Sequence, residues 1–188
     1  MNHIGTKNLE TERIILRKIG VNDAQLMYDN WASDNDVSKY VTWCTHKNVG
    51  ETSELLKNWE SEYTKINCYR WCIVSKENNE PIGTIDVCKS NDNLEMAEIG
   101  YCMSKRYWNK GIMTECANRI IQFLFEEVGY KRIQATHALE NPASGRVMQK
   151  IGMKYEGIIR DGNRLKNGNL CDVAMYSILA REYFKEEK

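Results

Sequence analysis

The segment with the most chemical information runs from Met103 to Thr114 and reads MSKRYWNKGIMT. Its pattern predicts that a strand ends near Met103, that a turn contains Gly111, and that a long helix begins after this turn. The first N–H groups of a helix have no partner inside the helix, so they would point at whatever lies beyond the strand. Such a helix start attracts anions, and phosphates in particular. The segment is therefore a candidate anion site.

Two common nucleotide-binding loops do not fit this segment. Its order is Lys110-Gly111, whereas a P-loop has Gly-Lys followed by Ser or Thr. It contains one glycine, whereas the dinucleotide-binding fingerprint needs several. A single glycine before a helix is also common in an ordinary turn. The anion site therefore needs support from the rest of the chain.

The elements around this segment are predicted from hydrophobic periodicity and turn residues. Short β-branched or aromatic runs predict strands at residues 13–19, 69–75, 81–89, 96–103, 132–138, 153–160 and 171–179. Apolar spacing predicts a helix carrying Leu26, Met27 and Trp31, one over 51–65, one from Met113 to Gly129, and a short one opened by Asn141-Pro142 and closed by Gly152. Turn-rich segments separate the strands between residues 69 and 103, which indicates an antiparallel meander. We expect one α+β domain over residues 1–188, with a polar loop at 161–169.

Composition excludes several classes of protein. The chain has 188 residues, with 26 Lys and Arg against 26 Asp and Glu, which argues against nucleic acid as the main partner. No apolar run approaches 18 residues and no secretory signal is visible, so we expect a cytoplasmic protein that does not bind membranes. The seven cysteines include no C-x-x-C, and there are three histidines. We therefore expect reduced, mostly buried thiols and no metal site.

Four motifs support the anion site, because together they resemble the Gcn5-related N-acetyltransferases (GNAT). They are LETERIILR at 9–17, IGY at 99–101, WNKGIMTE at 108–115, and NPAS at 141–144 followed by IGM at 151–153. The resemblance covers nearly the whole chain and is to the branch that acetylates the N-terminal amines of ribosomal proteins. It implies a mixed, mostly antiparallel sheet with splayed strands and helices on both faces. It also implies direct transfer from acetyl-CoA to a primary amine in a ternary complex.

The resemblance implies where acetyl-CoA would bind. The backbone of Tyr101, Cys102 and Met103 would hydrogen-bond the pantetheine arm as an added strand would. Asn141 would contact the cofactor, with a helix N-cap as the alternative and both roles together as a further one. Gly111 would leave space for the phosphate. The pyrophosphate would lie on the N–H groups of Asn109, Lys110, Gly111, Ile112, Met113 and Thr114. Trp108 and Met113 depart from the family, which usually has Gln or Arg and a small residue at these positions.

The implied reaction needs a neutral amine, a polarised carbonyl and a proton for the departing thiolate. Glu98 is the first candidate for the base and Glu140 the second, although each could be a solvated charge beside a strand end. A backbone N–H near Met103 would polarise the carbonyl. Relatives place a Tyr on the short helix, but the matching residue here is Met148. The resemblance therefore offers Ser144 as the hydroxyl near the sulfur, with capping of the first helical turn as the alternative.

The sequence says little about the acceptor. The segments expected beside it are residues 33–48, the helix around Trp59 and the loop 161–169, and all are mixed in charge. Tyr176 is another candidate hydroxyl, although a core aromatic residue with a satisfied hydroxyl fits it as well. A peptide N-terminus, a small-molecule amine, and a noncatalytic acyl-CoA-binding or partner-binding module on the same fold all remain open. A homodimer also remains open.

Overall fold

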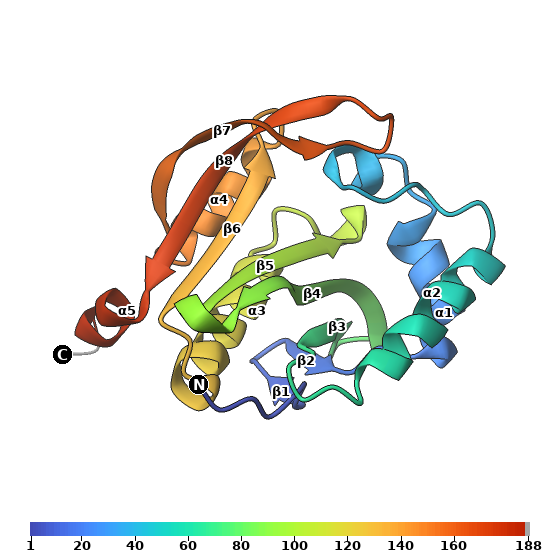
Figure 1. Cartoon of the computed structure of the whole chain (residues 1–188). Coiled ribbons are helices and arrows are strands. Elements are labelled where there is room, and N and C mark those ends of the chain that lie inside the picture. The colour runs from blue at the N-terminus through green and yellow to red at the C-terminus, as the bar shows by residue number, and fades with distance from the viewer. Residues whose placement is uncertain (187–188) are drawn as a thin grey trace.

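The computed structural model describes residues 1–186 and is built on an eight-stranded sheet, in the order β1-β2-β3-β4-β5-β6-β8-β7 (Figure 1). All neighbouring strands run antiparallel except β5 and β6, which are parallel. The strands are β1 (Leu9–Glu10), β2 (Ile14–Arg17), β3 (Arg70–Ser75), β4 (Glu80–Asn91), β5 (Met96–Met103), β6 (Arg132–Ala138), β7 (Lys154–Arg164) and β8 (Leu170–Leu179). The sheet is therefore mixed and mostly antiparallel, as predicted.

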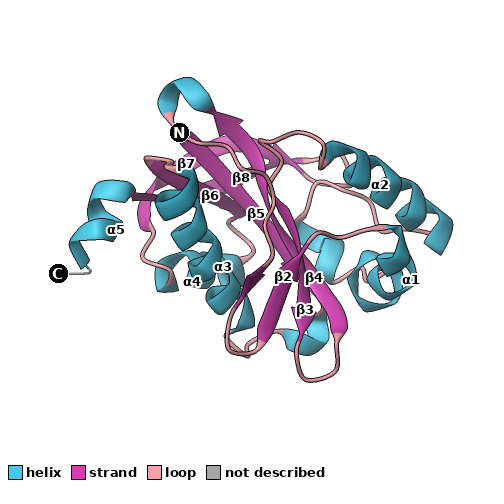
Figure 2. Ribbon diagram, turned by 90° about the horizontal axis from the view of Figure 1, so that it is seen from below, coloured by secondary structure: helices cyan, strands magenta, loops and turns pink. Residues whose placement is uncertain are grey.

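Helices cover both faces of the sheet (Figure 2). One face carries α1 and α2, and the other carries α3 and α4. The helices are α1 (Ala24–Met27), continued by a turn of π-helix (Tyr28–Ala32), α2 (Val49–Glu62), α3 (Ile112–Phe123), continued by Leu124–Val128, α4 (Pro142–Lys150) and α5 (Ala180–Glu186). A 3₁₀-helix, Val37–Tyr40, lies between α1 and α2 in the sequence. The predicted α+β arrangement with helices on both faces is confirmed.

Strand β5 has two chemically different faces because side chains alternate along a strand. Ala97, Ile99 and Met103 belong to the apolar core that contains α3 and α4. Gly100 and Cys102 lie on the opposite face, where Cys102 packs against the apolar cluster of α1 and α2. The face toward α3 and α4 is thus filled by side chains, whereas the other face is less bulky at Gly100.

Strands β5 and β6 separate part of the way along their length. They pair only over Met96–Glu98 and Arg132–Gln134, although β5 extends to Met103 and β6 to Ala138. Beyond this point the facing edges of the two strands are open (Figure 1). The splayed strands that the resemblance implied are confirmed.

The β7–β8 hairpin is longer than the sequence predicts. Residues 161–164 were expected in a loop, but they belong to β7, which bulges after Ile159 and resumes pairing at Asn163. A bulge breaks the alternation of polar and apolar residues, so the period is lost where the strand continues. The two-residue strand β1 and the helix α5 were not predicted either. Strand β1 is too short to show a period.

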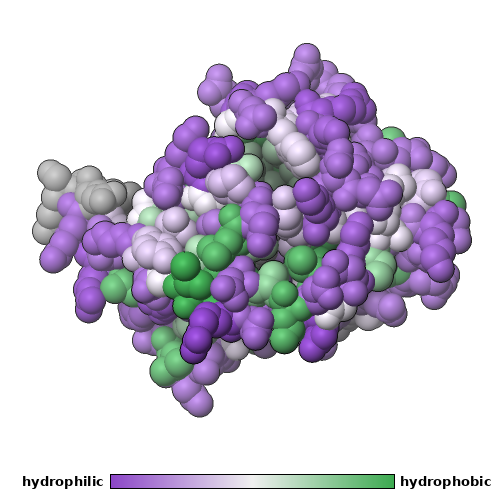
Figure 3. Space-filling view, turned by 90° about the horizontal axis from the view of Figure 1, so that it is seen from above, coloured by the Kyte–Doolittle hydropathy of each residue, from purple (hydrophilic) through white to green (hydrophobic). Residues whose placement is uncertain are grey.

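The surface seen from above is mostly hydrophilic with an apolar patch (Figure 3). Ile158, Ile159 and Leu170 of the β7–β8 hairpin are exposed apolar residues. Among residues 1–186, no helix has the length and apolar character needed to cross a membrane. All seven cysteines are free thiols, but the expectation that most are buried is wrong. The buried ones are Cys72, Cys116 and Cys171, and Cys44 and Cys88 are exposed.

Candidate active site

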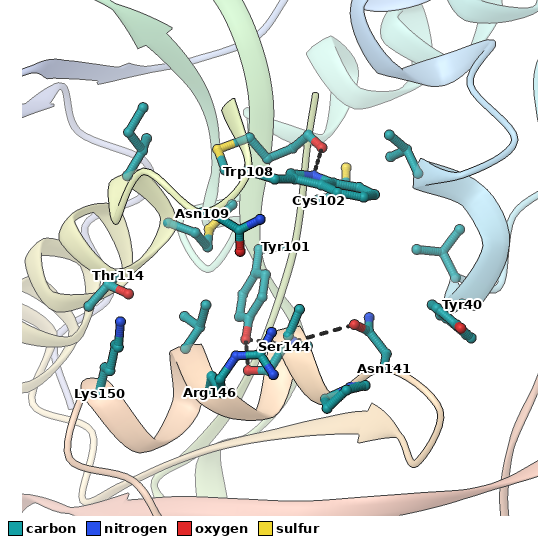
Figure 4. Close-up of a pocket in the computed structure, with 18 of the residues that line it drawn as sticks. Tyr40, Tyr101, Cys102, Trp108, Asn109, Thr114, Asn141, Ser144, Arg146 and Lys150 are labelled. Atoms are coloured by element: carbon teal, nitrogen blue, oxygen red, sulfur yellow. Dashed lines mark hydrogen bonds between the residues drawn. The ribbon is translucent and has the colours of Figure 1, made fainter. Parts of the chain in front are cut away.

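A cavity of about 490 Å³ opens where β5 and β6 separate (Figure 4). Its walls come from the 3₁₀-helix, the end of β5, the loop before α3, the start of α3, and α4. The predicted site residues that line it are Tyr101, Cys102, Met103, Asn109, Gly111, Ile112, Met113, Thr114, Glu140, Asn141 and Ser144. Lys110 and Glu98 are not among the lining residues. The fold therefore brings most of the residues singled out in the sequence into one space.

The loop before α3 presents backbone N–H groups next to this cavity. Asn109 and Gly111 both have positive φ, of 60° and 75°. Within residues 1–186, none of the N–H groups of residues 109–114 donates a hydrogen bond, and the first helical bond runs from Glu115 N–H to the Gly111 carbonyl. Unpaired N–H groups at a helix start form an anion site. The geometry predicted from the sequence is present.

A clamp from the N-terminal strands holds this loop in place. The Arg13 guanidinium donates to Glu115 Oε2 through Nε at 2.7 Å and to the Lys110 carbonyl through Nη1 at 3.1 Å. The backbone N–H of Arg13 and the hydroxyl of Thr11 both donate to Glu115 Oε1. Burial raises the pKa of Glu115, but the hydrogen bonds from Thr11 and Arg13 outweigh it, so the pKa is lowered overall. Three motif residues thus act together to fix residues 109–114, the anion loop.

This clamp could not be recognised from the sequence. Thr11 and Arg13 belong to the motif at 9–17 and Glu115 to the motif at 108–115, but 102 residues separate Arg13 from Glu115. The sequence signal was the motif at 9–17, in which Thr11 and Arg13 precede Ile14, the first residue of the apolar run. Nothing local in that signal identifies the partner.

The backbone N–H and C=O groups of successive residues of β5 point alternately to β4 and to the open edge. Ser104 donates its N–H to the Ile82 carbonyl on β4. Because backbone groups alternate along a strand, the N–H and C=O of Tyr101 and Met103 point to the opposite side, toward the separation from β6. Cys102 lines the cavity, but its backbone groups point to β4 by the same alternation. Two of the three residues expected to bind an added strand thus present their backbone groups to the open edge.

The two departures from the family pattern have structural explanations. The Trp108 indole Nε1 donates to the Met103 carbonyl at 2.8 Å, so this carbonyl is already engaged (Figure 4). The Met113 residue is 6% exposed and belongs to the core with α3. The side chain of Met113 therefore packs in the core, whereas the indole of Trp108 covers the Met103 end of the open edge.

The start of α4 faces Tyr101 across the cavity. Asn141 Oδ1 accepts from the Ser144 N–H at 3.4 Å, so the N-cap interpretation of Asn141 is confirmed. Its contact with a cofactor stays a prediction. Ser144 Oγ donates to the Tyr101 hydroxyl at 3.0 Å, and this hydroxyl donates to the Ser144 carbonyl at 3.1 Å (Figure 4). Burial raises the pKa of Tyr101 to about 12, which keeps its phenol protonated.

Two residues that the sequence analysis missed also line the cavity from α4. Arg146 and Lys150 lie one turn apart on this helix, and both carry a positive charge (Figure 4). The Tyr101 side chain was missed as well, since only its backbone was expected to take part. The spacing of four residues between the two cations was visible in the sequence. Their direction toward the cavity was not.

The two carboxylates proposed as bases lie in different environments. Glu98 is 8% exposed and accepts hydrogen bonds from Gln134 Nε2 at 2.9 Å and Lys89 Nζ at 3.4 Å. It lies at the last paired position of β5 and β6, where the two strands begin to separate. Glu140 is exposed and lines the cavity beside Asn141. Neither role is decided by this placement.

Met148, which stands where relatives have a Tyr, and Tyr176, the other hydroxyl candidate, both lie in the core. Met148 is 1% exposed, and the Tyr176 hydroxyl accepts from Gln149 Nε2 at 3.3 Å, outside the cavity lining. Tyr176 is thus a core aromatic residue with a satisfied hydroxyl. In the part of the chain that the structure describes, no group of three or more His, Cys, Asp or Glu is arranged to hold a metal ion.

Comparison with known proteins gives consistent results. Residues 13–154 match the family model described as acetyltransferase (GNAT) domain. The uncharacterized N-acetyltransferase p20 of Bacillus licheniformis is 32% identical over 177 residues, 94% of this chain and 98% of the relative. The [ribosomal protein uS5]-alanine N-acetyltransferase of Escherichia coli is 22% identical over 162 residues, 81% of each chain. The solved structure of the microcin C7 self-immunity acetyltransferase MccE, in complex with acetyl-CoA and AMP, has a TM-score of 0.80 at 21% identity and covers 90% of this chain and 93% of its own.

Proposed function

This chain belongs to the GNAT family and is an acetyl-CoA-dependent N-acetyltransferase, and on this premise we propose that its acceptor is the α-amine of a peptide or protein N-terminus. The observation that carries the reaction class is the open edge of β5 beside the unpaired N–H groups of residues 109–114. The acceptor class is supported by a relative whose name describes an alanine N-acetyltransferase. It is also supported by the small apolar wall that Val37 and Val41 give the cavity.

The proposed cofactor site follows from the free backbone groups. The pyrophosphate lies on the N–H groups of residues 109–114, and the cations of Arg146 and Lys150 balance further phosphate charge. The pantetheine arm pairs with the open edge of β5 from Met103 toward Tyr101, which places the thioester near Tyr101. Trp108 already bonds the Met103 carbonyl, so the arm takes fewer backbone bonds here than a full added strand would.

Two groups of this chain act on the carbonyl and on the amine in the proposed transfer. The Tyr101 N–H points to the open edge beside Ser144 and donates to the carbonyl oxygen as negative charge develops on it. An α-amine has a pKa of about 8 against about 10 for a lysine, so less help from a base is needed at neutral pH. Glu98 accepts the amine proton through a short chain of waters, since the carboxylate lies further along β5 and does not itself line the cavity. The bond from nitrogen to the acetyl carbon forms as the bond from carbon to sulfur breaks.

Ser144 and Tyr101 supply the proton for the thiolate in this proposal. The Ser144 hydroxyl lies on the cavity wall and is bonded to a phenol whose pKa of about 12 keeps it in the donor form. When Ser144 turns its O–H to the sulfur, the Tyr101 hydroxyl stays within reach to return a proton to it. Solvent then restores the phenol. The pair therefore acts as one proton relay.

The proposal is tested by thiol release from acetyl-CoA with a panel of acceptors. A peptide with a free N-terminus and no lysine should be acetylated faster than the same peptide with a blocked N-terminus and one lysine, as read by mass spectrometry. Ser144→Ala and Tyr101→Phe should each lower kcat by about tenfold to a hundredfold and leave the Kd for CoA within about twofold. Acetylation of small amines with no turnover of either peptide would refute the peptide acceptor.

A further inference from the structure

The anion loop and α4 together form the cofactor cradle on one face of β5. On the opposite face of the strand, Gly100 leaves a position without a side chain. This residue lies between Tyr101 of the cavity wall and Glu98, where the strands begin to separate. A Cβ placed on Gly100 would lie 3.4 Å from Asp86 Oδ1 and 3.5 Å from Cys88 Sγ. A methyl group at this position would therefore be in ordinary contact with Asp86 and Cys88, which border the position over Gly100.

The cofactor cradle leaves this face free for the acceptor. The anion loop and α4 approach β5 on the side of Ile99 and Met103. An amine that attacks a thioester lying along the open edge must come from another direction, and the face of Gly100 and Cys102 is available. Figure 1 shows this face of β4 and β5 between α2 and the β7–β8 hairpin. Cys102 lines the cavity, so the space over Gly100 adjoins it.

Asp86 has one oxygen without a partner at this space. It pairs with Gly100 across β4 and β5, and its Oδ2 lies 3.4 Å from Arg70 Nε. Arg70 makes a shorter ion pair of 2.7 Å with Glu62 and stacks over Trp59 at 4.3 Å. Within residues 1–186, Oδ1 of Asp86 has no hydrogen bond, and a quarter of the side chain is exposed. Arg70 is thus held mainly by Glu62, and Asp86 keeps an acceptor oxygen facing Gly100.

An ammonium group already approaches the neighbouring carboxylate on this face. Lys89 Nζ lies 3.4 Å from Glu98 Oε1, and the lysine side chain is 74% exposed. Asp86 is the cross-strand partner of Gly100 on β4, and Glu98 lies two residues before Gly100 on the same face of β5, beside the bulge between Val87 and Lys89. The position between them therefore favours a cation of the size of an alkylammonium.

We propose that Asp86 binds the protonated acceptor amine over Gly100 and so sets the preference of this enzyme for cationic amines. The inference rests on the proposed function for the direction from which the amine arrives, but it holds for any primary amine. The ammonium donates to Asp86 Oδ1, and water beside Glu98 then takes its proton before attack on the thioester. Burial raises the pKa of Asp86 and the charge of Glu62 adds to this, whereas Arg70 lowers it, as expected for a carboxylate with incomplete charge pairing.

Two variants separate the charge of this site from its space. Asp86→Asn removes the charge and keeps the shape, and Gly100→Ala keeps the charge and fills the space with a methyl group in ordinary contact with Asp86. Glu62→Gln is the matched control, because it removes the other carboxylate beside Arg70 and does not touch the space over Gly100. Each variant is compared by thermal unfolding and by its Kd for CoA before any kinetic comparison.

The kinetic readout uses whichever amine of the panel the wild type acetylates fastest, at saturating acetyl-CoA. We expect Asp86→Asn and Gly100→Ala to raise the amine KM about tenfold or more, with Kd for CoA within twofold and a smaller effect for Glu62→Gln. CoA-loaded wild type should also bind the free-amine form of this acceptor more tightly than its acetylated form, and Asp86→Asn should lose that preference.

The outcomes separate this inference from the proposed function. An unchanged amine KM in Asp86→Asn, or equal effects of Asp86→Asn and Glu62→Gln, would overturn the role of Asp86. If peptides are not acetylated but small amines are, only the peptide acceptor is refuted, because the Asp86 variants are then compared on the small amine. If Asp86→Asn unfolds, the amine KM of Gly100→Ala still tests the inference, because this variant leaves the pair of Asp86 and Arg70 in place. An unchanged KM in Gly100→Ala would then overturn it.

Discussion

The clamp between Glu115 and the N-terminal strand gives a prediction whose size follows from its contacts. Glu115 accepts from the Thr11 hydroxyl and from the backbone N–H, Nε and Nη2 of Arg13. Glu115→Gln keeps the shape and one acceptor oxygen but removes the charge. Hydrogen bonds to charged groups contribute about 1.5–3 kcal/mol each, roughly twice the neutral value. Arg13 is 48% exposed, which lowers its share. We expect a loss of about 2 kcal/mol in the free energy of unfolding.

This loss is measurable in two assays. For a chain of this size, 2 kcal/mol corresponds to a fall in Tm of about 4–8 °C. Because Arg13 also donates to the Lys110 carbonyl, a loosened clamp should raise the Kd for CoA several-fold. Glu127→Gln is the control, because Glu127 lies 3.9 Å from Arg119 with 47% of its side chain exposed, and its Tm should stay within about 1 °C of the wild type.

The pH dependence gives an independent check on the same clamp. The pKa of Glu115 is lower in the folded protein than in the unfolded chain. The stability from Glu115 is therefore complete above the unfolded pKa, near 4.5, and is lost as the pH falls through the folded value. The Tm difference between wild type and Glu115→Gln should shrink at acid pH. A Tm and a CoA affinity like those of the wild type in Glu115→Gln at pH 7 would refute the clamp.

Three further predictions concern single positions. Gly111→Ala places a side chain at a φ of 75°, so we expect the free energy of unfolding to fall by about 1–2 kcal/mol and CoA to bind more weakly. A Tm and a CoA titration curve like those of the wild type would contradict this. Gly145→Ala puts a Cβ 2.6 Å from His137 Nε2, so the free energy of unfolding should fall by about 1–3 kcal/mol. An unchanged Tm would show that the His137 ring moves aside freely. Burial lowers the pKa of His46, whose ring bonds the Thr52 hydroxyl, so the folded state disfavours its protonation and stability should fall below about pH 6.5. His46→Gln should reduce that fall in a denaturant series from pH 7.5 to 5.5, and an equal fall would exclude His46 as its cause.

Much of the fold could be predicted because it depends on local signals. The bounds of β5 and β6 follow from short apolar runs between turn residues, and both match the structure. Gly129 and Gly152 end their helices with positive φ, as glycine after a helix predicts. The failures have a local reason too. The continuation of β7 past Ile159 was missed because a bulge interrupts the alternation on which strand prediction depends.

The sequence by itself determined the anion loop and the family. Both depend on backbone geometry set by neighbouring residues, because Gly111 permits a positive φ and the apolar stripe of α3 fixes the direction of the helix. Only the tertiary structure decided which side chains meet. Arg13 with Glu115, Tyr101 with Ser144, and Asp86 with the bare Gly100 come from separate elements, and their distances depend on how strands and helices pack. Short-range chemistry of this kind acts over a few ångströms, which spacing along a chain does not specify.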